Sequence, residues 1–269
     1  MTILVTGATG SVGRLVVDHL LAAGATDVRA LTNKPEKAAL PNEVDVVKGY
    51  IGLPETLPPA LEGVDRMYLA PLTETVHEVL ALARKAGVQH VVDLAGPEGN
   101  WWHAIEVAVE ESGIAWTHLD AGEFMENSLI WADQIRTTGQ VRDAYPDAAN
   151  APIAMDDIAA VAALALIEDG HVGRAYELTG PESLTRADLV RCIGAALGRD
   201  IPYVELTREQ AVEQLSKAMG EYADWYLEGK AALVAHPQQA VATVAQVTGR
   251  PATTFAQWAV KHVDAFRVA

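Results

Sequence analysis

The chain has 269 residues, of which 50% are apolar and 21% charged, a balance typical of globular rather than disordered proteins. No apolar run approaches the about 18 residues that a membrane-spanning helix needs. The net charge of −16 argues against binding to nucleic acid or to an anionic membrane, because either would require a basic surface. The single cysteine, Cys192, excludes an internal disulfide and is expected to be buried, so we predict a cytoplasmic location.

Short apolar runs alternate with helical patterns over the first 120 residues. The chain begins directly with a predicted strand at residues 3–5, without the basic segment of a signal peptide. Further strands are predicted at residues 28–31, 44–48, 67–69, 91–94 and 116–119. Helices are predicted from residue 12, and at about residues 55–61, 73–85 and 101–111. Strands and helices in this order predict an α/β fold of Rossmann type, a doubly wound parallel sheet with helices on both faces.

The pattern changes after residue 122 and becomes mainly helical. Asp156 or Asp157 is the expected cap of a helix over residues 158–167, and residues 175–178 are strand-like. Another helix is predicted at 184–197, and from Thr207 onward the pattern is almost wholly helical.

We therefore predict two domains. A Rossmann-type domain is expected at residues 1–122, with strands and helices of the later chain returning to it. A smaller, α-rich substrate-binding lobe is expected at residues 123–269.

A G-x-x-G-x-x-G turn joins the first strand to the first helix, which is the context that a dinucleotide-binding motif requires. Its glycines permit a tight turn and close approach of the backbone to a pyrophosphate at the helix N-terminus. The predicted cofactor-binding residues of this turn are Gly7, Thr9, Gly10, Ser11, Val12 and Gly13.

The loop after the second strand distinguishes NAD from NADP. An NAD site places an acidic residue there, about 20 residues after the glycine turn. This chain has Asn33 and Lys34, with no acid before Glu36. A 2′-phosphate paired with Lys34 is therefore favoured and NADPH is the predicted cofactor, the alternative being an ordinary loop lysine. Residues at the ends of later strands complete the predicted cofactor site: Tyr50, Ala70, Pro71, Ala95 and Gly96.

The chain resembles the NmrA-like branch of atypical short-chain dehydrogenases, which includes NADPH-dependent quinone reductases and NADP(H)-sensing regulators. The resemblance extends nearly end to end. It rests on residues 4–10, 28–31, 111–117, 124–127, 156–161, 170–182 and 247–251. It implies an oxidoreductase fold with a substrate lobe, but it does not fix a substrate.

Three positions depart from the pattern of that family. An arginine is usual where Asn33 stands, so the resemblance leaves the phosphate contact to Lys34. Gly-Asp is usual where this chain has Gly49 and Tyr50, and this aromatic ring could stack on adenine or simply pack. An arginine is also common where Asp120 stands, which makes the predicted pocket more acidic.

The Ser-Tyr-Lys set of typical short-chain dehydrogenases is missing from the expected places. Residues 93–96 contain no serine, and the following helix contains no Tyr-x-x-x-Lys. Hydride addition to a simple ketone produces an alkoxide that needs a proton donor in place. Addition to a quinone or a polycyclic aromatic carbonyl delocalises the charge, so we predict a quinone-like or polycyclic aromatic, polyketide-type substrate.

His103 is the candidate catalytic proton donor, since it begins the helix that would carry the tyrosine and titrates in a useful range. The alternative is a solvent-facing histidine. His118, within a strand, is expected to be a hydrogen-bonded core residue. Asp120, Glu123 and Glu126 follow the sixth strand, where they are either surface charges or include an acid of raised pKa.

An apolar wall for a flat substrate is predicted from Trp101, Trp102, Phe124 and Met125, together with Glu123, the alternative for the apolar residues being core packing. No metal site is expected, because no two of the eight histidines are three or four residues apart. The expected partner is a small-molecule substrate, and the oligomeric state stays open.

Three functions of different kinds remain open. The favoured one is a reductase that transfers hydride from NADPH to the substrate. The alternative is a regulatory sensor of NADP(H) that acts through a protein partner, and a nicotinamide-using isomerase or ether reductase is a weaker third.

Overall fold

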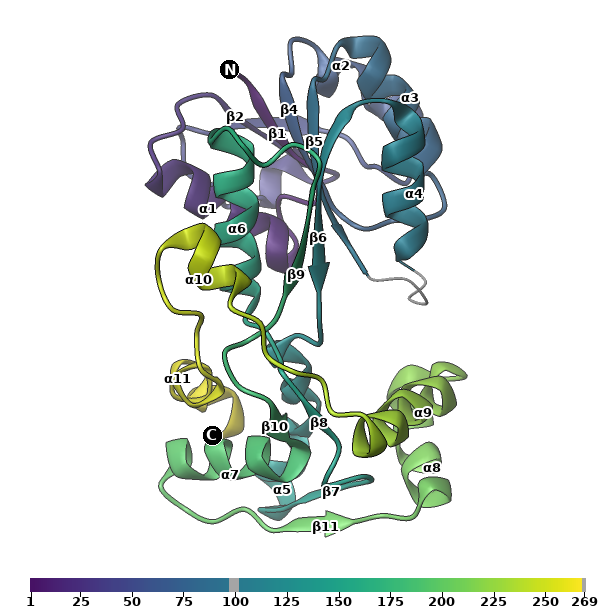
Figure 1. The fold of residues 1–269 in the computed structure, drawn as a ribbon, viewed down its shortest axis with the longest axis vertical. Coiled ribbons are helices and arrows are strands. Elements are labelled where there is room, and N and C mark those ends of the chain that lie inside the picture. Colours follow the sequence, from purple (N-terminus) through teal and green to yellow (C-terminus); the bar gives the residue numbers. More distant parts are fainter. Residues whose placement is uncertain (97–101, 268–269) are drawn as a thin grey trace. The chain divides into compact units, whose positions relative to one another are not determined.

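The computed structural model describes residues 1–96 and 102–267 (Figure 1). Their contacts divide the chain into two compact units. The first unit comprises Met1–Gly122, Met155–Leu178 and Thr243–Arg250. The second unit comprises Glu123–Ala154, Thr179–Ala242 and Pro251–Ala269.

The first unit contains a seven-stranded sheet in the order β3-β2-β1-β4-β5-β6-β9, and all its pairings are parallel. Its strands are β1 Ile3–Val5, β2 Val28–Thr32, β3 Asp45–Lys48, β4 Arg66–Leu69, β5 His90–Ala95, β6 Ala115–Ala121 and β9 Arg174–Leu178. The strand order reverses at β1, between β2 and β4, which is where such sheets bind ligands. The predicted doubly wound parallel sheet is confirmed.

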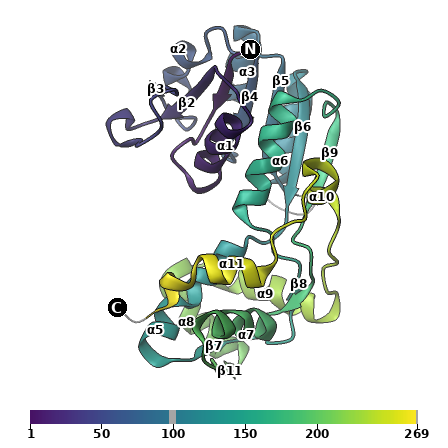
Figure 2. The ribbon, with the colours of Figure 1, turned by 90° about the vertical axis from the view of Figure 1, so that its left-hand side faces the viewer.

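Helices cover both faces of this sheet (Figures 1 and 2). They are α1 Ser11–Ala22, η1 Pro35–Lys37, η2 Pro54–Thr56, α2 Pro58–Leu61, α3 Val76–Ala86, α4 His103–Ser112, α6 Met155–Ile167 and α10 Thr243–Thr248. The helix α6 packs against α1 and the strands β4, β5 and β6, while α3 packs along α4. Most residues of α6 are buried, as expected for a helix that is apolar nearly all round.

The predicted caps of α6 are wrong, because the helix already begins at Met155. Asp156 and Asp157 lie in its first turn, where negative charge complements the helix dipole. The Asp156 carboxylate lies 3.2 Å from the His19 ring, and Asp157, which is fully buried, accepts a 2.7 Å hydrogen bond from Arg250.

The second unit is mainly helical. Its helices are η3 Met125–Trp131, α5 Ala132–Thr138, α7 Arg186–Leu197, α8 Arg208–Met219, α9 Tyr222–Ala235, α11 Phe255–Lys261 and η4 Val263–Phe266. Capping boxes at Thr185, Thr207 and Thr254 fix the starts of α7, α8 and α11. Two small sheets pair β8 Ala149–Asn150 with β10 Leu184–Thr185 and β7 Val141–Asp143 with β11 Tyr203–Glu205. Among the described residues, no helix combines the length and apolarity needed to cross a membrane.

Candidate functional site

The glycine turn is shaped by close approaches that only glycine permits. Gly7 has φ +59°, and a Cβ placed there would lie 2.9 Å from the Ala70 Cβ. A Cβ on Gly13 would lie 2.2 Å from the Gly7 carbonyl oxygen, which accepts a 2.8 Å hydrogen bond from the Gly10 amide. Gly10 caps α1 without a side-chain hydrogen bond, so the helix N-terminus presents its backbone N–H groups for an anion.

A cavity of about 250 Å³ lies beside this turn, at the carboxyl ends of the strands around the switch point. Six residues predicted for the cofactor line it: Gly7, Thr9, Asn33, Tyr50, Ala70 and Pro71. The remaining lining residues are Leu31, Thr32, Gly49, Ile51 and Leu72.

Two threonines hold the loops of this cavity in place. The Thr6 hydroxyl donates to the Tyr68 carbonyl (3.0 Å) and accepts from the Ala70 amide (2.8 Å), which fixes the end of β1 to the end of β4. The Thr32 hydroxyl lies 3.3 Å from the Thr9 hydroxyl and 3.3 Å from the Lys34 amide, so the glycine turn and the loop after β2 are joined.

The other predicted cofactor residues take different positions. The ring of Tyr50, 44% exposed, packs against Gly52, where a Cβ would lie 2.4 Å from the Tyr50 Cε1, and it also lines the cavity. Lys34 is exposed on the adjoining loop and is not a lining residue. Ser11 and Val12 form the first turn of α1. Ala95 and Gly96 are buried at the end of β5, and neither lines this cavity.

His103 is the first residue of α4, and its side chain is 37% exposed. Its Nδ1 lies 3.3 Å from the Glu106 Oε2, one turn further along the helix. Burial raises the pKa of Glu106 to about 9, aided by a hydrogen bond to Asp120, by the charge of Asp120 and, more weakly, by Asp93. Sequence reasoning missed Glu106, although its spacing of three residues from His103 placed both on one helix face.

His118 is a buried core histidine, as the sequence predicts. Its Nδ1 lies 2.7 Å from the Asp93 Oδ2, and its ring stacks on Trp116 with 4.0 Å between centroids. Burial raises the pKa of Asp93, and the contact with His118 opposes this shift. Asp93 thus lies two residues before the end of β5, fully buried and bound to His118.

The predicted aromatic wall is only partly described. Trp101 lies outside the described residues. Trp102 is partly buried against the core of the first unit. Met125 takes the alternative position that the sequence left open: its side chain is 1% exposed and packs in the core of the second unit.

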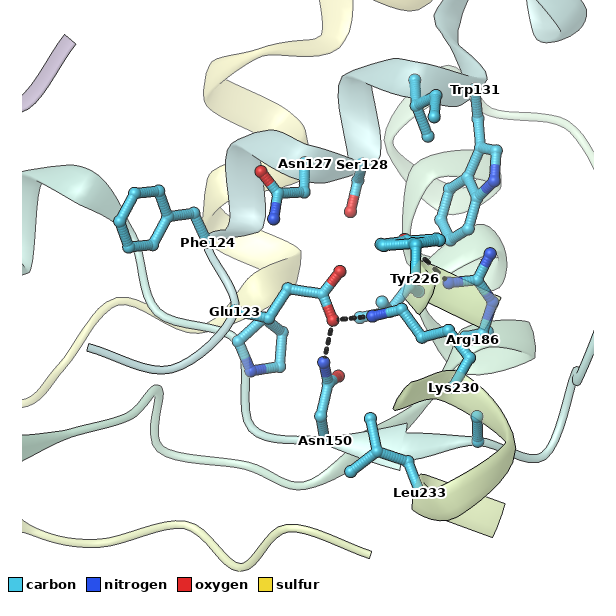
Figure 3. A pocket seen from close by; sticks show the side chains of 14 residues that line it. Glu123, Phe124, Asn127, Ser128, Trp131, Asn150, Arg186, Tyr226, Lys230 and Leu233 are labelled. Carbon is cyan, nitrogen blue, oxygen red and sulfur yellow. Dashed lines mark hydrogen bonds and ion pairs between the residues drawn. The ribbon is translucent and has the colours of Figure 1, made fainter. Parts of the chain in front are cut away.

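Glu123 and Phe124 line a pocket in the second unit (Figure 3). Its free volume is about 10 Å³, room for about one water molecule, because Lys230 from α9 fills it. The Lys230 ammonium pairs with the Glu123 carboxylate, which also accepts a hydrogen bond from the Asn150 amide. Burial alone would raise the pKa of Glu123, but the positive charges of Lys230 and Arg186 hold it below its usual value.

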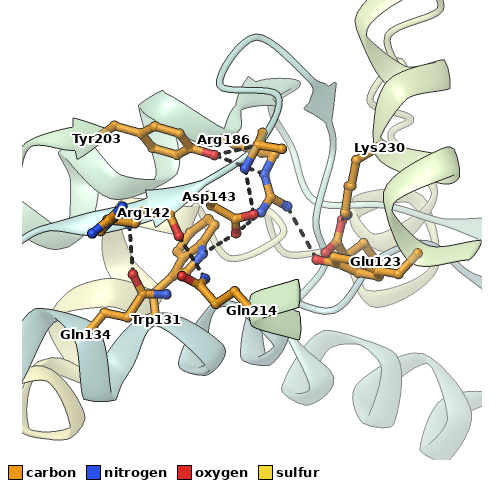
Figure 4. A network of polar contacts seen from close by, with 11 residues as sticks. Glu123, Trp131, Gln134, Arg142, Asp143, Arg186, Tyr203, Gln214 and Lys230 are labelled. Carbon is orange, nitrogen blue, oxygen red and sulfur yellow. Dashed lines mark hydrogen bonds and ion pairs between the residues drawn. The ribbon is translucent and has the colours of Figure 1, made fainter. Parts of the chain in front are cut away.

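A second buried ion pair adjoins this pocket (Figure 4). Arg186 pairs with Asp143, whose carboxylate also accepts a 2.8 Å hydrogen bond from the Trp131 indole. The Arg186 guanidinium lies 5.1 Å from the centroid of the Trp131 ring. Both buried cations of the second-unit pocket are therefore matched by a carboxylate. Among the residues that the structure describes, no group of three or more His, Cys, Asp or Glu side chains is arranged so that it could hold a metal ion.

The glycine turn, the parallel sheet and the cavity at its switch point define a dinucleotide-binding protein of the Rossmann class. Residues 7–169 match a family described as NAD(P)H-binding, and the chain belongs to this family. The predicted resemblance to NmrA-like atypical short-chain dehydrogenases and the prediction of a nicotinamide-dependent oxidoreductase are confirmed.

Relatives along the whole chain support this assignment. The chain is 38% identical to the (4-alkanoyl-5-oxo-2,5-dihydrofuran-3-yl)methyl phosphate reductase of Streptomyces griseus, over 98% of this chain and 99% of that one. It is 37% identical to the NAD(P)H azoreductase of Xenophilus azovorans, over 99% and 100%. The crystal structure of an NADPH-dependent quinone oxidoreductase from Escherichia coli matches with TM-score 0.85 and 26% identity, over 98% of this chain and 100% of that chain.

Proposed function

We propose that this protein is an NADPH-dependent reductase that transfers hydride to a quinone-like or polycyclic aromatic carbonyl without a Ser-Tyr-Lys triad. The observation that carries the proposal is the cavity over the glycine turn, with Asn33 in its lining and Lys34 beside it, where an NAD site would have an acid. The close approaches at Gly7 and Gly13 support the proposal because they hold the turn tight against Ala70 and against its own backbone, the shape that a pyrophosphate-binding turn needs.

The residues of the first unit have distinct tasks in this proposal. The first turn of α1 binds the pyrophosphate, the Tyr50 ring covers the adenosine end, and Lys34 pairs with the 2′-phosphate. The bound cofactor supplies the hydride. His103 donates the proton, because Asp93 is fully buried against His118 and the described part of α4 contains no tyrosine.

The second unit favours a neutral substrate. The pocket lined by Glu123 has room for about one water molecule and its two cations are paired with carboxylates, so it offers a phosphate group neither space nor an unpaired positive charge. We therefore propose that an uncharged aromatic acceptor is preferred to a phosphorylated one such as that in the name of the Streptomyces relative. A cytoplasmic location stays a prediction from the sequence.

The test combines turnover with binding. Purified protein is mixed with NADPH and a panel of quinones, polycyclic aromatic ketones and one phosphorylated acceptor, and the absorbance of the reduced nicotinamide is followed. Steady oxidation with a quinone or aromatic ketone supports the reductase. Tight NADPH binding without turnover of any acceptor would favour the alternative, an NADP(H)-sensing regulatory protein that acts through a protein partner.

A further inference from the structure

Acidic side chains meet between α4 and the strands below it. The helix α4 packs on β5 and β6, and His103, Glu106 and Glu110 follow one another at helical spacing along one face. In the sheet, Asp93 is in register with His118, and Ala95 with Asp120, so both strands present acids to the same side. Two chains of contacts result, one from His103 through Glu106 to Asp120, the other from Asp93 through His118.

Three buried carboxylate oxygens of this cluster have no hydrogen-bond partner among the described residues: Glu106 Oε1, Asp120 Oδ1 and Asp93 Oδ1. The other oxygen of Asp93 is bound to His118, whereas Glu106 and Asp120 interact with each other. An ionised carboxyl group only accepts hydrogen bonds, so two such groups in contact cannot satisfy each other. One proton makes one of them a donor, and a single O–H···O bond then satisfies both oxygens.

The surroundings also favour a proton over a second negative charge. Within the described chain, His103 is the one basic group in ion-pair contact with Glu106, and none contacts Asp120. The other groups facing the pair are Asp93, paired with His118, and Glu110, 3.8 Å from the His118 Nε2. On the far side of β6, the exposed Glu177 of β9 stands in register with Asp120, and on α3 Arg84 is bound to the Ser112 carbonyl at the other end of α4.

We propose that Glu106 and Asp120 hold one proton between them and pass it through His103 to the reduced substrate. This inference rests on the proposed function, with His103 as the catalytic residue and the two acids as positioning residues that act through it. The Nδ1 of His103 is buried 3.3 Å from the Glu106 Oε2 and has no hydrogen-bond partner among the described residues, which leaves Nδ1 for the Glu106 proton and Nε2 for the substrate.

The step balances in atoms and charge. Hydride from NADPH adds two electrons and a hydrogen to the substrate, which leaves a negative oxygen and NADP⁺. The His103 Nε2–H bond breaks and an O–H bond forms on the substrate, while Nδ1 accepts the proton of Glu106. Glu106 and Asp120 are then both ionised. A proton from water adds to the His103 Nε2 and the Nδ1 proton returns to Glu106, which restores both the histidine and the pair. A second negative charge in this buried place makes reprotonation favourable.

The first measurement needs neither cofactor nor substrate. Side-chain carboxyl groups of ¹³C-labelled protein are titrated by NMR in the wild type, Glu106→Gln and Asp120→Asn, with Glu110→Gln as control from the same helix face. We expect one carboxyl that titrates in the alkaline range in the wild type and in the control, and that is lost in both variants of the pair. The absence of such a carboxyl in the wild type would overturn the inference. If circular dichroism shows that one of the two variants does not fold, loss of the alkaline titration in the other variant serves as the test.

The second measurement is the pH profile of kcat with the best acceptor. In the wild type and in Glu110→Gln, kcat should fall as the pH rises past the alkaline titration. In Glu106→Gln, kcat at neutral pH should be about 10-fold lower at unchanged KM, and this alkaline decline should vanish. A Glu106→Gln enzyme with the wild-type profile would overturn the relay. If a carboxyl group titrates in the alkaline range but the protein turns over no acceptor, the proposed function is contradicted. The inference that Glu106 and Asp120 share a proton would still hold.

Discussion

The glycine turn provides a sharp test of the cofactor site. A Cβ at residue 13 would lie 2.2 Å from the Gly7 carbonyl oxygen, whereas ordinary contact begins at 3.4 Å, so Gly13→Ala requires a displacement of about 1.2 Å. The obstructing atom is backbone of the turn itself, and the same carbonyl accepts the Gly10 amide. Relief of the clash therefore opens the turn that would bind the pyrophosphate. We expect Gly13→Ala to lower the free energy of unfolding by about 1–3 kcal/mol, the range for overpacked sites. Its affinity for NADPH should fall at least about 10-fold, equivalent to about 1.4 kcal/mol.

The assays are urea denaturation and fluorescence titration with NADPH. The matched control is Gly229→Ala in α9, where a Cβ would meet nothing within 4 Å. Since alanine is the better helix former, the control should gain about 0.5–1 kcal/mol and keep its NADPH affinity. A Gly13→Ala protein as stable as the wild type, with unchanged affinity, would refute the reasoning from these distances.

Three further variants test other parts of the molecule. Glu123→Gln leaves the buried Lys230, 6% exposed, without its counter-charge and should cost about 3–5 kcal/mol in urea denaturation, whereas Glu123→Leu combined with Lys230→Met should recover most of the loss. Lys34→Ala should weaken NADPH binding about 10-fold and leave NADH binding unchanged, with Lys37→Ala as control, and equal losses for both cofactors would contradict the phosphate contact. Burial, with the charges of Arg66 and His171, lowers the pKa of His90 to about 4. Between pH 6.5 and 4, His90 is therefore protonated in the unfolded chain but neutral in the folded chain. The free energy of unfolding should fall as the pH drops from about 6.5 to 4. In His90→Asn this part of the loss should disappear from denaturation curves measured across that range.

The parts of the fold that follow local rules were predictable from the sequence. The strands of the first unit are apolar runs, and the glycine turn stands between a strand and a helix, so the sheet and most of the cavity lining follow from short segments. The short strands of the second unit span two or three residues, too few to show an alternating pattern.

Charge pairing over long sequence separations was not predictable. Lys230 and Glu123 are 107 residues apart, and Arg186 and Asp143 are 43 apart, so nothing local indicates either partner. For the same reason Glu123 is predicted from the sequence to contact the substrate. In the structure its carboxylate forms an ion pair with Lys230 and accepts a hydrogen bond from Asn150. Met125 carries the apolar side chain expected of a substrate wall, but burial in a core requires the same property.

The two buried charge clusters differ in a way that indicates which of them has a chemical task. In the second unit, Glu123 is paired with Lys230 and Asp143 with Arg186, and such balanced pairs specify packing without any proton exchange. Between α4 and β6, the part of the chain that the structure describes places only the half-exposed His103 beside Glu106 and no cation beside Asp120. The two carboxyl groups of this cluster can hydrogen-bond to each other only when one of them is protonated. The stability of the cluster therefore depends on pH, which is a disadvantage for folding unless the proton is used in the reaction. Unsatisfied groups of this kind are expected where function rather than folding has selected the residues, so the α4–β6 cluster, and not the ion pairs of the second unit, is the place to test for catalysis.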